Sequence, residues 1–169
     1  MPILPFLTAL SLQAPEPPAV VPKVDLRRYT GIWYEIAKYP NRFQRGCLCT
    51  TATYTLKPNG KVAVVNRCRT AAGKTREAKG WAKVMDPSTN AKLKVTFFWP
   101  FFGDYWILDL DEDYTRVLVG SPDRRYLWIL SRTPRLEESA YQILAQRAVA
   151  LGFNPTQLVR TEPCGADSH

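Results

Sequence analysis

From Asp25 onward, apolar and polar side chains alternate along most of the chain with a period of two residues. Successive side chains of a β-strand point to opposite faces, so this pattern indicates strands with one buried face. Short segments rich in Gly, Pro, Asn and Asp separate the runs and predict tight turns. Such regular spacing favours an antiparallel up-and-down barrel or a sandwich. The strand-like runs are residues 51–56, 61–69, 75–84, 91–99, 104–110, 116–120 and 126–131.

One segment follows a helical period instead. Residues 135–151 place apolar side chains three and four positions apart, with Pro134 before them and Gly152 after them. We therefore expect an amphipathic helix that packs on the outside of the sheet. A short strand at residues 157–161 is expected to follow it.

Residues 1–24 are predicted to form a leader ahead of one domain at residues 25–164, with a tail at 165–169. The apolar run at residues 3–12 has the length of a signal-peptide core, and a proline-rich stretch follows it. No Lys or Arg precedes that run, so a disordered leader is the alternative. Residues 1–25 contain no cysteine, so this sequence does not encode a lipid-modified N-terminal cysteine. We expect an exported protein that is periplasmic, associated with the outer membrane, or secreted.

The formal net charge of +8 favours partners that carry negative charge. The basic residues are scattered, and no strand face combines them with aromatic side chains as single-strand binders do. We therefore expect no nucleic-acid binding, and contact with an anionic membrane surface stays open. The single histidine, His169, is the last residue, which argues against histidine catalysis and histidine-ligated metal. We expect no metal, no cofactor and no enzymatic activity.

Four cysteines, Cys47, Cys49, Cys68 and Cys164, allow three pairings. The last lies 96 residues beyond the third, unlike the closely spaced ligand pairs of a zinc site. Two disulfides are therefore favoured over a zinc site, and they indicate an oxidising compartment.

Three motifs occur in order along the chain. Gly31-Ile32-Trp33 opens the first strand, Asp111-Glu112-Asp113-Tyr114 lies at a turn, and Arg132 ends the last main strand before the helix. Over about residues 25–164, this order resembles the lipocalin family, and the cysteines are similar to those of its apolipoprotein D-like branch. The resemblance implies an all-β fold, an eight-stranded up-and-down antiparallel barrel with one helix packed outside. The stretches most similar to bacterial outer-membrane lipocalins are residues 33–37, 97–103 and 126–134.

The motif residues are interpreted as determinants of the fold and not as part of a binding site. Gly31 lets the chain turn sharply into the closed end of the barrel, and Trp33 plugs that end. Arg132 can lay its guanidinium group on the Trp33 indole, a contact worth about 0.5–2 kcal/mol. Tyr114 joins this structural set through the turn motif.

An eight-stranded barrel is wide enough inside for one elongated ligand. The inward-facing residues are placed by strand alternation and by similarity to lipocalins. Among them Ala78, Gly80 and Ala82 are small, so we expect a cavity and not a fully packed barrel. The candidate ligand-binding residues are Glu35, Ala37, Phe43, Ala52, Tyr54, Val64, Asn66, Ala82, Val95, Phe97, Tyr105, Ile107, Val117, Tyr126 and Trp128.

Glu35 is the exception in this apolar set, because a buried carboxylate needs a partner or becomes protonated. It either anchors a polar group of the ligand or pairs with Asn66 or a tyrosine hydroxyl. Near the expected mouth, basic and aromatic residues suit an amphiphile with an anionic head, although solvation alone also accounts for each arginine. These residues are Arg42, Phe43, Arg45, Arg67, Arg69, Phe101 and Phe102.

The resemblance also implies a cysteine pairing. Apolipoprotein D-like lipocalins tie the C-terminal segment to this part of the barrel, which implies Cys49–Cys164 and leaves Cys47–Cys68. Alternation turns Cys49 outward but Cys68 inward, so the second pair needs a bulge, and Cys49–Cys68 stays open as the competing pair.

The function implied by the resemblance is binding and transport or storage of a small amphiphile in the bacterial cell envelope. A fatty acid or lysophospholipid is the expected ligand, and the protein is expected to be a monomer or homodimer. The alternatives are a carrier of a retinoid, sterol or pigment, and a lipocalin-type isomerase. For the isomerase, Cys68 is the one candidate thiol, and a disulfide would remove it.

Overall fold

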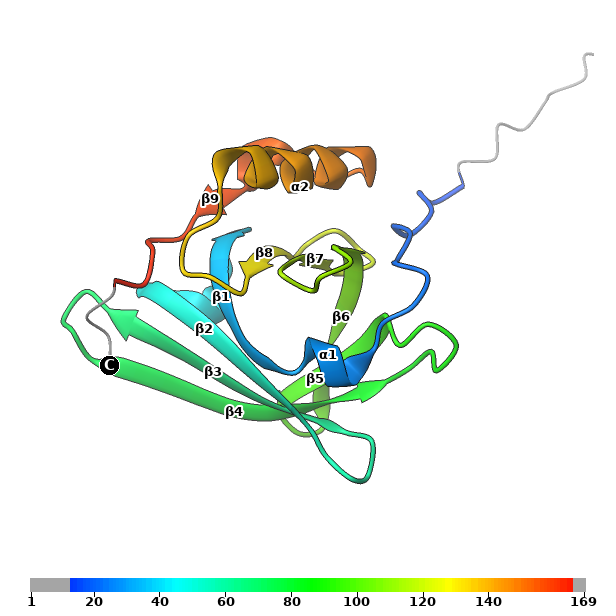
Figure 1. Ribbon diagram of the computed structural model, residues 1–169, viewed down its shortest axis with the longest axis horizontal. Coiled ribbons are helices and arrows are strands. Elements are labelled where there is room, and N and C mark those ends of the chain that lie inside the picture. The colour runs from blue at the N-terminus through cyan, green and yellow to red at the C-terminus, as the bar shows by residue number, and fades with distance from the viewer. Residues whose placement is uncertain (1–12, 166–169) are drawn as a thin grey trace, which may run out of the picture.

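Eight antiparallel strands close into a barrel in the computed structural model, which describes residues 13–165. Each strand pairs with its sequence neighbour, and β1 closes the ring by pairing with both β8 and β2 (Figure 1). The expected barrel is therefore confirmed over the sandwich. The strands are β1 (Gly31–Lys38), β2 (Cys47–Leu56), β3 (Val62–Thr70), β4 (Thr75–Val84), β5 (Lys92–Phe98), β6 (Phe101–Leu110), β7 (Arg116–Gly120) and β8 (Leu127–Ser131).

The remaining elements of the described chain are one short strand and four helical segments that are not among the eight barrel strands. A short strand, β9 (Val159–Arg160), pairs with β1 at Ala37 and Lys38. The helices are α1 (Leu26–Tyr29), the 3₁₀ turns η1 (Arg42–Gln44) and η2 (Pro155–Gln157), and α2 (Glu138–Ala150). No helix among residues 13–165 is both long enough and apolar enough to cross a membrane.

Three boundaries differ clearly from the sequence expectation. Strand β2 begins at Cys47, four residues before the predicted run at 51–56. The hairpin between β5 and β6 turns over Trp99 and Pro100 alone, because Phe101 already pairs with Phe98. The gap predicted between the strand-like runs 91–99 and 104–110 was therefore too long. Helix α2 begins at Glu138 and not near 135, because Glu137 has an extended backbone (φ −56°, ψ 141°).

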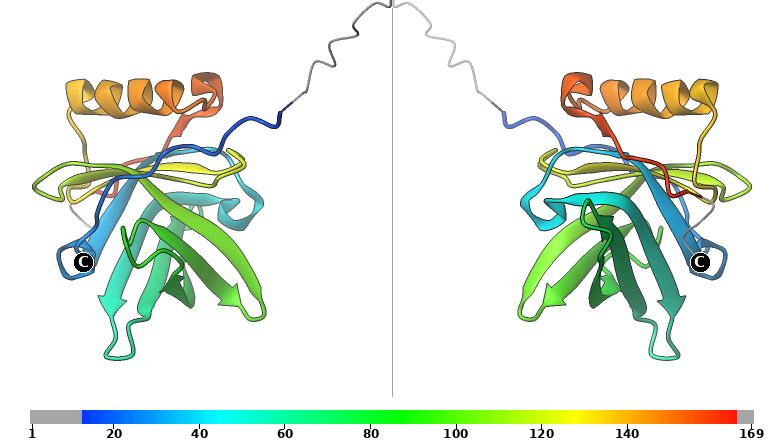
Figure 2. Two further views of the ribbon diagram at one scale, coloured as in Figure 1. Left: turned by 90° about the vertical axis from the view of Figure 1, so that its right-hand side faces the viewer. Right: turned by 90° about the vertical axis from the view of Figure 1, so that its left-hand side faces the viewer.

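Helix α2 lies against one side of the barrel, as predicted (Figure 2). Its buried side chains include Tyr141, Leu144 and Ala148, and they pack on the outer faces of β1, β6, β7 and β8. Leu144 is fully buried there, and burying one leucine side chain contributes about 1.5–3 kcal/mol. A second core fills the part of the barrel interior around Trp33.

The end of the expected leader belongs to the folded unit. The Val21 amide donates to the carbonyl oxygen of Ile107 and the Val24 amide to that of Thr89, at 3.0 and 2.7 Å. Val24 is fully buried in the inner core. The packed structure therefore starts before residue 25, and the apolar run at residues 3–12 lies outside the described residues.

The three motifs meet at the closed end of the barrel. Trp33 is fully buried, and its indole nitrogen donates to the Tyr29 carbonyl oxygen at 2.9 Å. Gly31 has φ +101°, a left-handed conformation that side-chain-bearing residues rarely adopt. The Tyr114 hydroxyl accepts a hydrogen bond from the Asp25 amide at 2.8 Å, which fixes the start of α1. The floor is thus built from segments far apart in the sequence.

Two disulfides tie the opposite end, and their pairing is Cys47–Cys68 and Cys49–Cys164. A register shift between Cys47 and Thr50 provides the bulge that the first pair needs. Because β2 carries one extra residue there, Cys47 reaches the same face as Cys68, while Cys49 meets the C-terminal segment outside. The alternative Cys49–Cys68 pair is absent from the structure.

Candidate ligand-binding site

A cavity of about 870 Å³ occupies the barrel above the Trp33 floor. It extends from Tyr29 at the closed end to the exposed rings of Phe43 and Phe98 at the open end. Its wall is largely apolar, with Val64, Leu93 and Val95 among the residues that form it. Volumes in this range are typical of small-molecule sites. The barrel therefore holds space for a ligand and is not filled by its own side chains.

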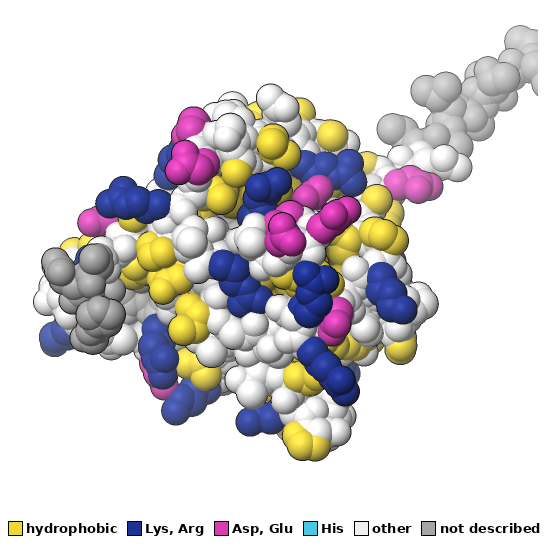
Figure 3. Space-filling model, viewed as in Figure 1, with side chains coloured by type: hydrophobic (Ala, Val, Ile, Leu, Met, Phe, Trp, Pro, Cys, Tyr) yellow, Lys and Arg dark blue, Asp and Glu magenta, His cyan; other side chains and the backbone are white. Residues whose placement is uncertain are grey.

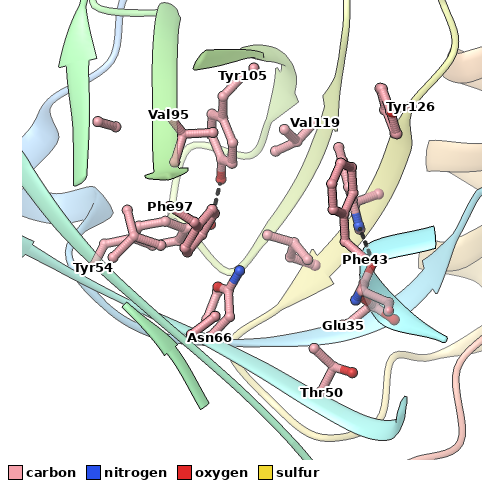
Figure 4. Close-up of a pocket in the computed structure, with 18 of the residues that line it drawn as sticks. Glu35, Phe43, Thr50, Tyr54, Asn66, Val95, Phe97, Tyr105, Val119 and Tyr126 are labelled. Carbon is pink, nitrogen blue, oxygen red and sulfur yellow. Dashed lines mark hydrogen bonds between the residues drawn. The ribbon is translucent and has the colours of Figure 1, made fainter. Parts of the chain in front are cut away.

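Thirteen of the fifteen candidate residues line this cavity, from seven strands and two loops (Figure 4). They are Glu35, Phe43, Ala52, Tyr54, Val64, Asn66, Ala82, Val95, Phe97, Tyr105, Ile107, Tyr126 and Trp128.

Ala37 and Val117 lie outside the cavity. A bulge between Glu35 and Ala37 interrupts the alternation of β1 and turns Ala37 outward, where it is fully buried in the core under α2. Val117 does lie inside the barrel, but in the packed core below the cavity, where it contributes to the floor.

Gly80 does not open the cavity as expected. A Cβ atom at this position would collide with the Thr96 carbonyl oxygen and the Phe97 ring, so neighbouring chain already fills the space. The small residues that do border the cavity on β4 are Ala78 and Ala82.

Glu35 is buried and fully partnered, but not by the groups that the sequence suggested. Gln44 Nε2 donates to one carboxylate oxygen, and the other accepts from the Thr161 hydroxyl and pairs with Lys38 Nζ at 3.1 Å. Asn66 and the tyrosine hydroxyls do not contact it within the described residues. The carboxylate therefore ties β1 to η1 and to the chain after β9.

Gln44 connects this cluster to the cavity wall. Its Oε1 accepts hydrogen bonds from Trp128 Nε1 at 3.0 Å and from Asn41 Nδ2 at 2.8 Å. The Tyr126 and Trp128 rings stack at 5.8 Å between centroids, and Phe43 lies 6.3 Å from Tyr126. The loop between β1 and β2 is thereby fixed against β8, with the 60% exposed Phe43 at the cavity entrance.

The rim carries charges of both signs. Arg42, Arg67 and Arg76 border the cavity, whereas Arg45 and Arg69 do not. Arg67 pairs with Glu77 at 2.6 Å, and Arg76 donates to the Arg45 carbonyl oxygen at 2.6 Å. Acidic Asp104 and Asp123 also border the entrance. Beyond the rim, Lys and Arg are spread over the surface with Asp and Glu among them (Figure 3).

Three tyrosine hydroxyls meet at the closed end of the cavity. The Tyr105 hydroxyl lies 2.7 Å from that of Tyr29 and 2.9 Å from that of Tyr54. Burial raises the pKa of Tyr54 to about 12 and raises the pKa of Tyr29 and Tyr105 well above 10. All three groups are therefore neutral phenols at physiological pH.

Sequence reasoning missed Tyr29, Gln44 and Thr50, which also line the cavity. Thr50 is two residues before Ala52 on the same strand face, so a longer predicted strand would have included it. Tyr29 and Gln44 lie in short helical turns, where no strand alternation applies.

The isomerase alternative requires a free thiol inside the barrel. Cys68 is bonded to Cys47, so it offers no thiol in this form, and no free cysteine occurs among residues 13–165. The same residues contain no group of three or more His, Cys, Asp or Glu able to hold a metal ion.

The family model described as "Lipocalin-like domain" matches residues 24–163. The chain belongs to the lipocalin family. Temperature-induced lipocalin-1 of Arabidopsis thaliana is 45% identical over 84% of this chain and 81% of the plant protein. The outer membrane lipoprotein Blc of Citrobacter freundii is 39% identical over 98% of each chain. Apolipoprotein D of Bos taurus is 37% identical over 73% of this chain and 68% of its own length.

Solved lipocalin structures share the fold of this lipocalin at low sequence identity. Insecticyanin from Manduca sexta gives a TM-score of 0.72 at 20% identity, covering 91% of this chain and 88% of its own. Apocrustacyanin C2 gives 0.71 at 17% identity, covering 84% and 81%. Lipocalins are binding proteins for small hydrophobic molecules, and the apolar cavity of this chain is of that kind.

Proposed function

We propose that this lipocalin binds and carries or stores a single-chain amphiphile, either a fatty acid or a lysophospholipid, in a cell envelope. The observation that carries the proposal is the 870 Å³ cavity, with apolar walls and a charged rim at its open end. Each methylene group of an acyl chain buried there contributes about 0.8 kcal/mol. The tail lies in the barrel and the polar head stays at the rim.

The mixed charges at the rim favour a lysophospholipid head over a bare carboxylate. Arg42 and Arg76 supply donors for a phosphate. Asp104, which pairs with Lys94 at 3.1 Å, and Asp123 supply carboxylate oxygens for an ammonium group. Below the rim, Thr50 is buried and its hydroxyl has no protein partner in the described structure. That hydroxyl suits an ester or hydroxyl group between the head and the tail.

The proposed location rests on the relatives and on one exposed hairpin. The Blc relatives are named outer membrane lipoproteins, which favours a periplasmic or outer-membrane site. Phe98, Trp99 and Phe101 are 82%, 75% and 77% exposed at the tip between β5 and β6. Aromatic side chains are favoured at membrane interfaces, so this tip is suited to touch an anionic lipid surface as the ligand transfers. The protein acts as a monomer or homodimer.

Titration of the delipidated protein tests the ligand class. Palmitic acid and palmitoyl lysophosphatidylethanolamine are added separately, and the emission of Trp128 and the other tryptophans is followed. We expect saturable, one-to-one quenching by at least one of the two. Retinol and cholesterol serve as competing classes, and tighter binding of either would contradict the proposal. Native mass spectrometry of the freshly purified protein identifies which molecule it carries.

A further inference from the structure

The hydroxyl cluster of Tyr29, Tyr54 and Tyr105 is an unexpected end for a cavity that holds a hydrocarbon tail. The Tyr29 ring lies on the Trp33 floor, with centroids 5.1 Å apart, and its backbone oxygen accepts from the same indole. Figure 4 shows Tyr105 reaching toward Tyr54 across the cavity. A tail that enters with its head at the rim therefore points its far end toward these hydroxyls.

The three phenols carry one more hydrogen than they use. Each hydroxyl has one hydrogen atom, and the cluster makes two hydrogen bonds, both through Tyr105. Within residues 13–165 no other acceptor contacts these oxygens, so one O–H is left over. A buried donor without an acceptor costs free energy. A saturated tail ends in a methyl group, which has no atom that can accept a hydrogen bond.

A neutral acceptor fits this place better than a charged one. Burial keeps the pKa of all three hydroxyls above 10, so the cluster carries no charge to balance a carboxylate at physiological pH. The guanidinium group of Arg132 lies against the Trp33 ring, and its nitrogens donate to the carbonyl oxygens of Ile32, Arg28 and Tyr114. A hydroxyl or carbonyl oxygen matches the spare O–H without bringing an unpaired charge into the barrel.

We propose that the tyrosine cluster is a subsite for a neutral oxygen at the buried end of the ligand. The ligand class is then an acyl amphiphile oxygenated at or near the far end of its chain. This inference rests on the proposed function, because it assumes that the tail enters first and the head stays at the rim. With an unsubstituted tail, the spare hydrogen is left without a partner or holds a trapped water.

Paired ligands test the subsite. Palmitic acid and 16-hydroxyhexadecanoic acid are titrated into the wild type, Tyr105→Phe and the triple variant Tyr29→Phe, Tyr54→Phe, Tyr105→Phe, and the ratio of their two Kd values is compared between proteins. This ratio cancels the general effect of each substitution on the cavity. Tyr105→Phe removes the shared hydroxyl and leaves the O–H groups of Tyr29 and Tyr54 without their partner, so the preference for the hydroxylated chain should not fall there. The triple variant has no O–H left in the cluster, and one neutral hydrogen bond corresponds to about a three- to tenfold change, so we expect the preference to fall by that factor in the triple variant. The same comparison is made with shorter fatty acids and their terminally hydroxylated analogues, in case a chain of sixteen carbons does not place its end at the cluster.

Tyr39→Phe is the matched control. Its hydroxyl donates to the Asn154 carbonyl oxygen at 2.8 Å, outside the cavity, so the ratio should equal that of the wild type. An unchanged ratio in the triple variant would overturn the subsite while leaving the proposed function intact. Loss of palmitic acid affinity in Tyr105→Phe would also overturn it, since the carboxyl group would then lie at the closed end. If neither these acids nor palmitoyl lysophosphatidylethanolamine bound the wild type, the proposed function would fail together with the subsite.

Discussion

The guanidinium carbon of Arg132 lies 3.9 Å from the centroid of the Trp33 ring. Its three nitrogens donate to the carbonyl oxygens of Tyr114, Ile32 and Arg28. One side chain thereby joins β1, α1 and the turn before β7 beneath the cavity. These contacts hold the closed end of the barrel together beneath the cavity.

Arg132→Ala should destabilise the fold without touching the cavity wall. Loss of the cation–π contact and of the charge-assisted hydrogen bonds should lower the free energy of unfolding by about 2–4 kcal/mol. Arg132→Lys keeps the charge but cannot reach three carbonyls, so it should recover less than half of the loss. Urea denaturation measures both. A loss below about 0.5 kcal/mol for the alanine variant would show that the floor is held by other contacts.

Gly31→Ala tests backbone conformation and space together. Gly31 has φ +101°, and a Cβ atom there would lie 3.2 Å from Arg132 Nη1. We expect a destabilisation of more than about 1 kcal/mol. Gly60→Ala is the control, because Gly60 has φ +81° but open space around its Cβ position. Equal losses for the two variants in urea denaturation would mean that contact with Arg132 adds nothing.

Ala78→Trp should block the ligand site. Ala78 borders the cavity on β4, and a large ring there displaces part of a bound chain. Excluding two methylene groups costs about 1.6 kcal/mol, or roughly tenfold in Kd for palmitic acid. The adjacent Lys79 points to the other face of the strand, so Lys79→Trp should bind as the wild type does. Equal affinity for both variants, measured by calorimetry, would place the ligand elsewhere.

The two disulfides should contribute unequally to stability. Cys49–Cys164 spans 115 residues and Cys47–Cys68 spans 21. Chain entropy alone gives contributions of about 4.8 and about 3.3 kcal/mol. The double substitution Cys49→Ala with Cys164→Ala should therefore lower the free energy of unfolding by about 1.5 kcal/mol more than the corresponding change at Cys47 and Cys68. The reverse order in denaturant titrations would contradict the entropic account.

Alkaline pH should weaken the fold through the tyrosine cluster. Burial raises the pKa of Tyr54 to about 12, whereas an unfolded tyrosine titrates near 10. Below pH 10 both states are protonated and the contribution to stability is fully present. Above it the unfolded chain releases protons that the native state retains, so stability falls progressively toward pH 12. Tyr105→Phe should make this fall shallower in urea denaturation at stepped pH, and an unchanged slope would contradict the assignment.

Strand alternation predicted the barrel wall well because one face of each strand is buried and the other is solvated. It failed on β1, where the bulge after Glu35 puts Ile36 and Ala37 on the same side under α2. Alternation contains no information about where an extra residue is inserted. It also could not reveal that Gly80 makes room for the Phe97 ring and not for a ligand.

The polar contacts of the site were less predictable than its walls. The sequence marked Glu35 as a buried carboxylate in need of a partner, but its partners Gln44 and Thr161 lie in a loop and after β9. Such contacts depend on how the chain returns in space. The disulfide pairing came from the family resemblance, because the residues alone left Cys49–Cys68 open.

The Glu35 carboxylate binds the loop at the mouth of the barrel through Gln44 and the returning chain through Thr161. Three residues beyond Thr161, Cys164 is fastened to β2. Glu35 consequently connects the loop at the mouth to the C-terminal segment, in addition to the contact of Gln44 with Trp128 and the disulfide at Cys164. A substitution that displaces Thr161 therefore also removes a contact of the carboxylate that holds Gln44. The rate of ligand exchange at the mouth should then depend on the C-terminal segment as well as on the cavity wall.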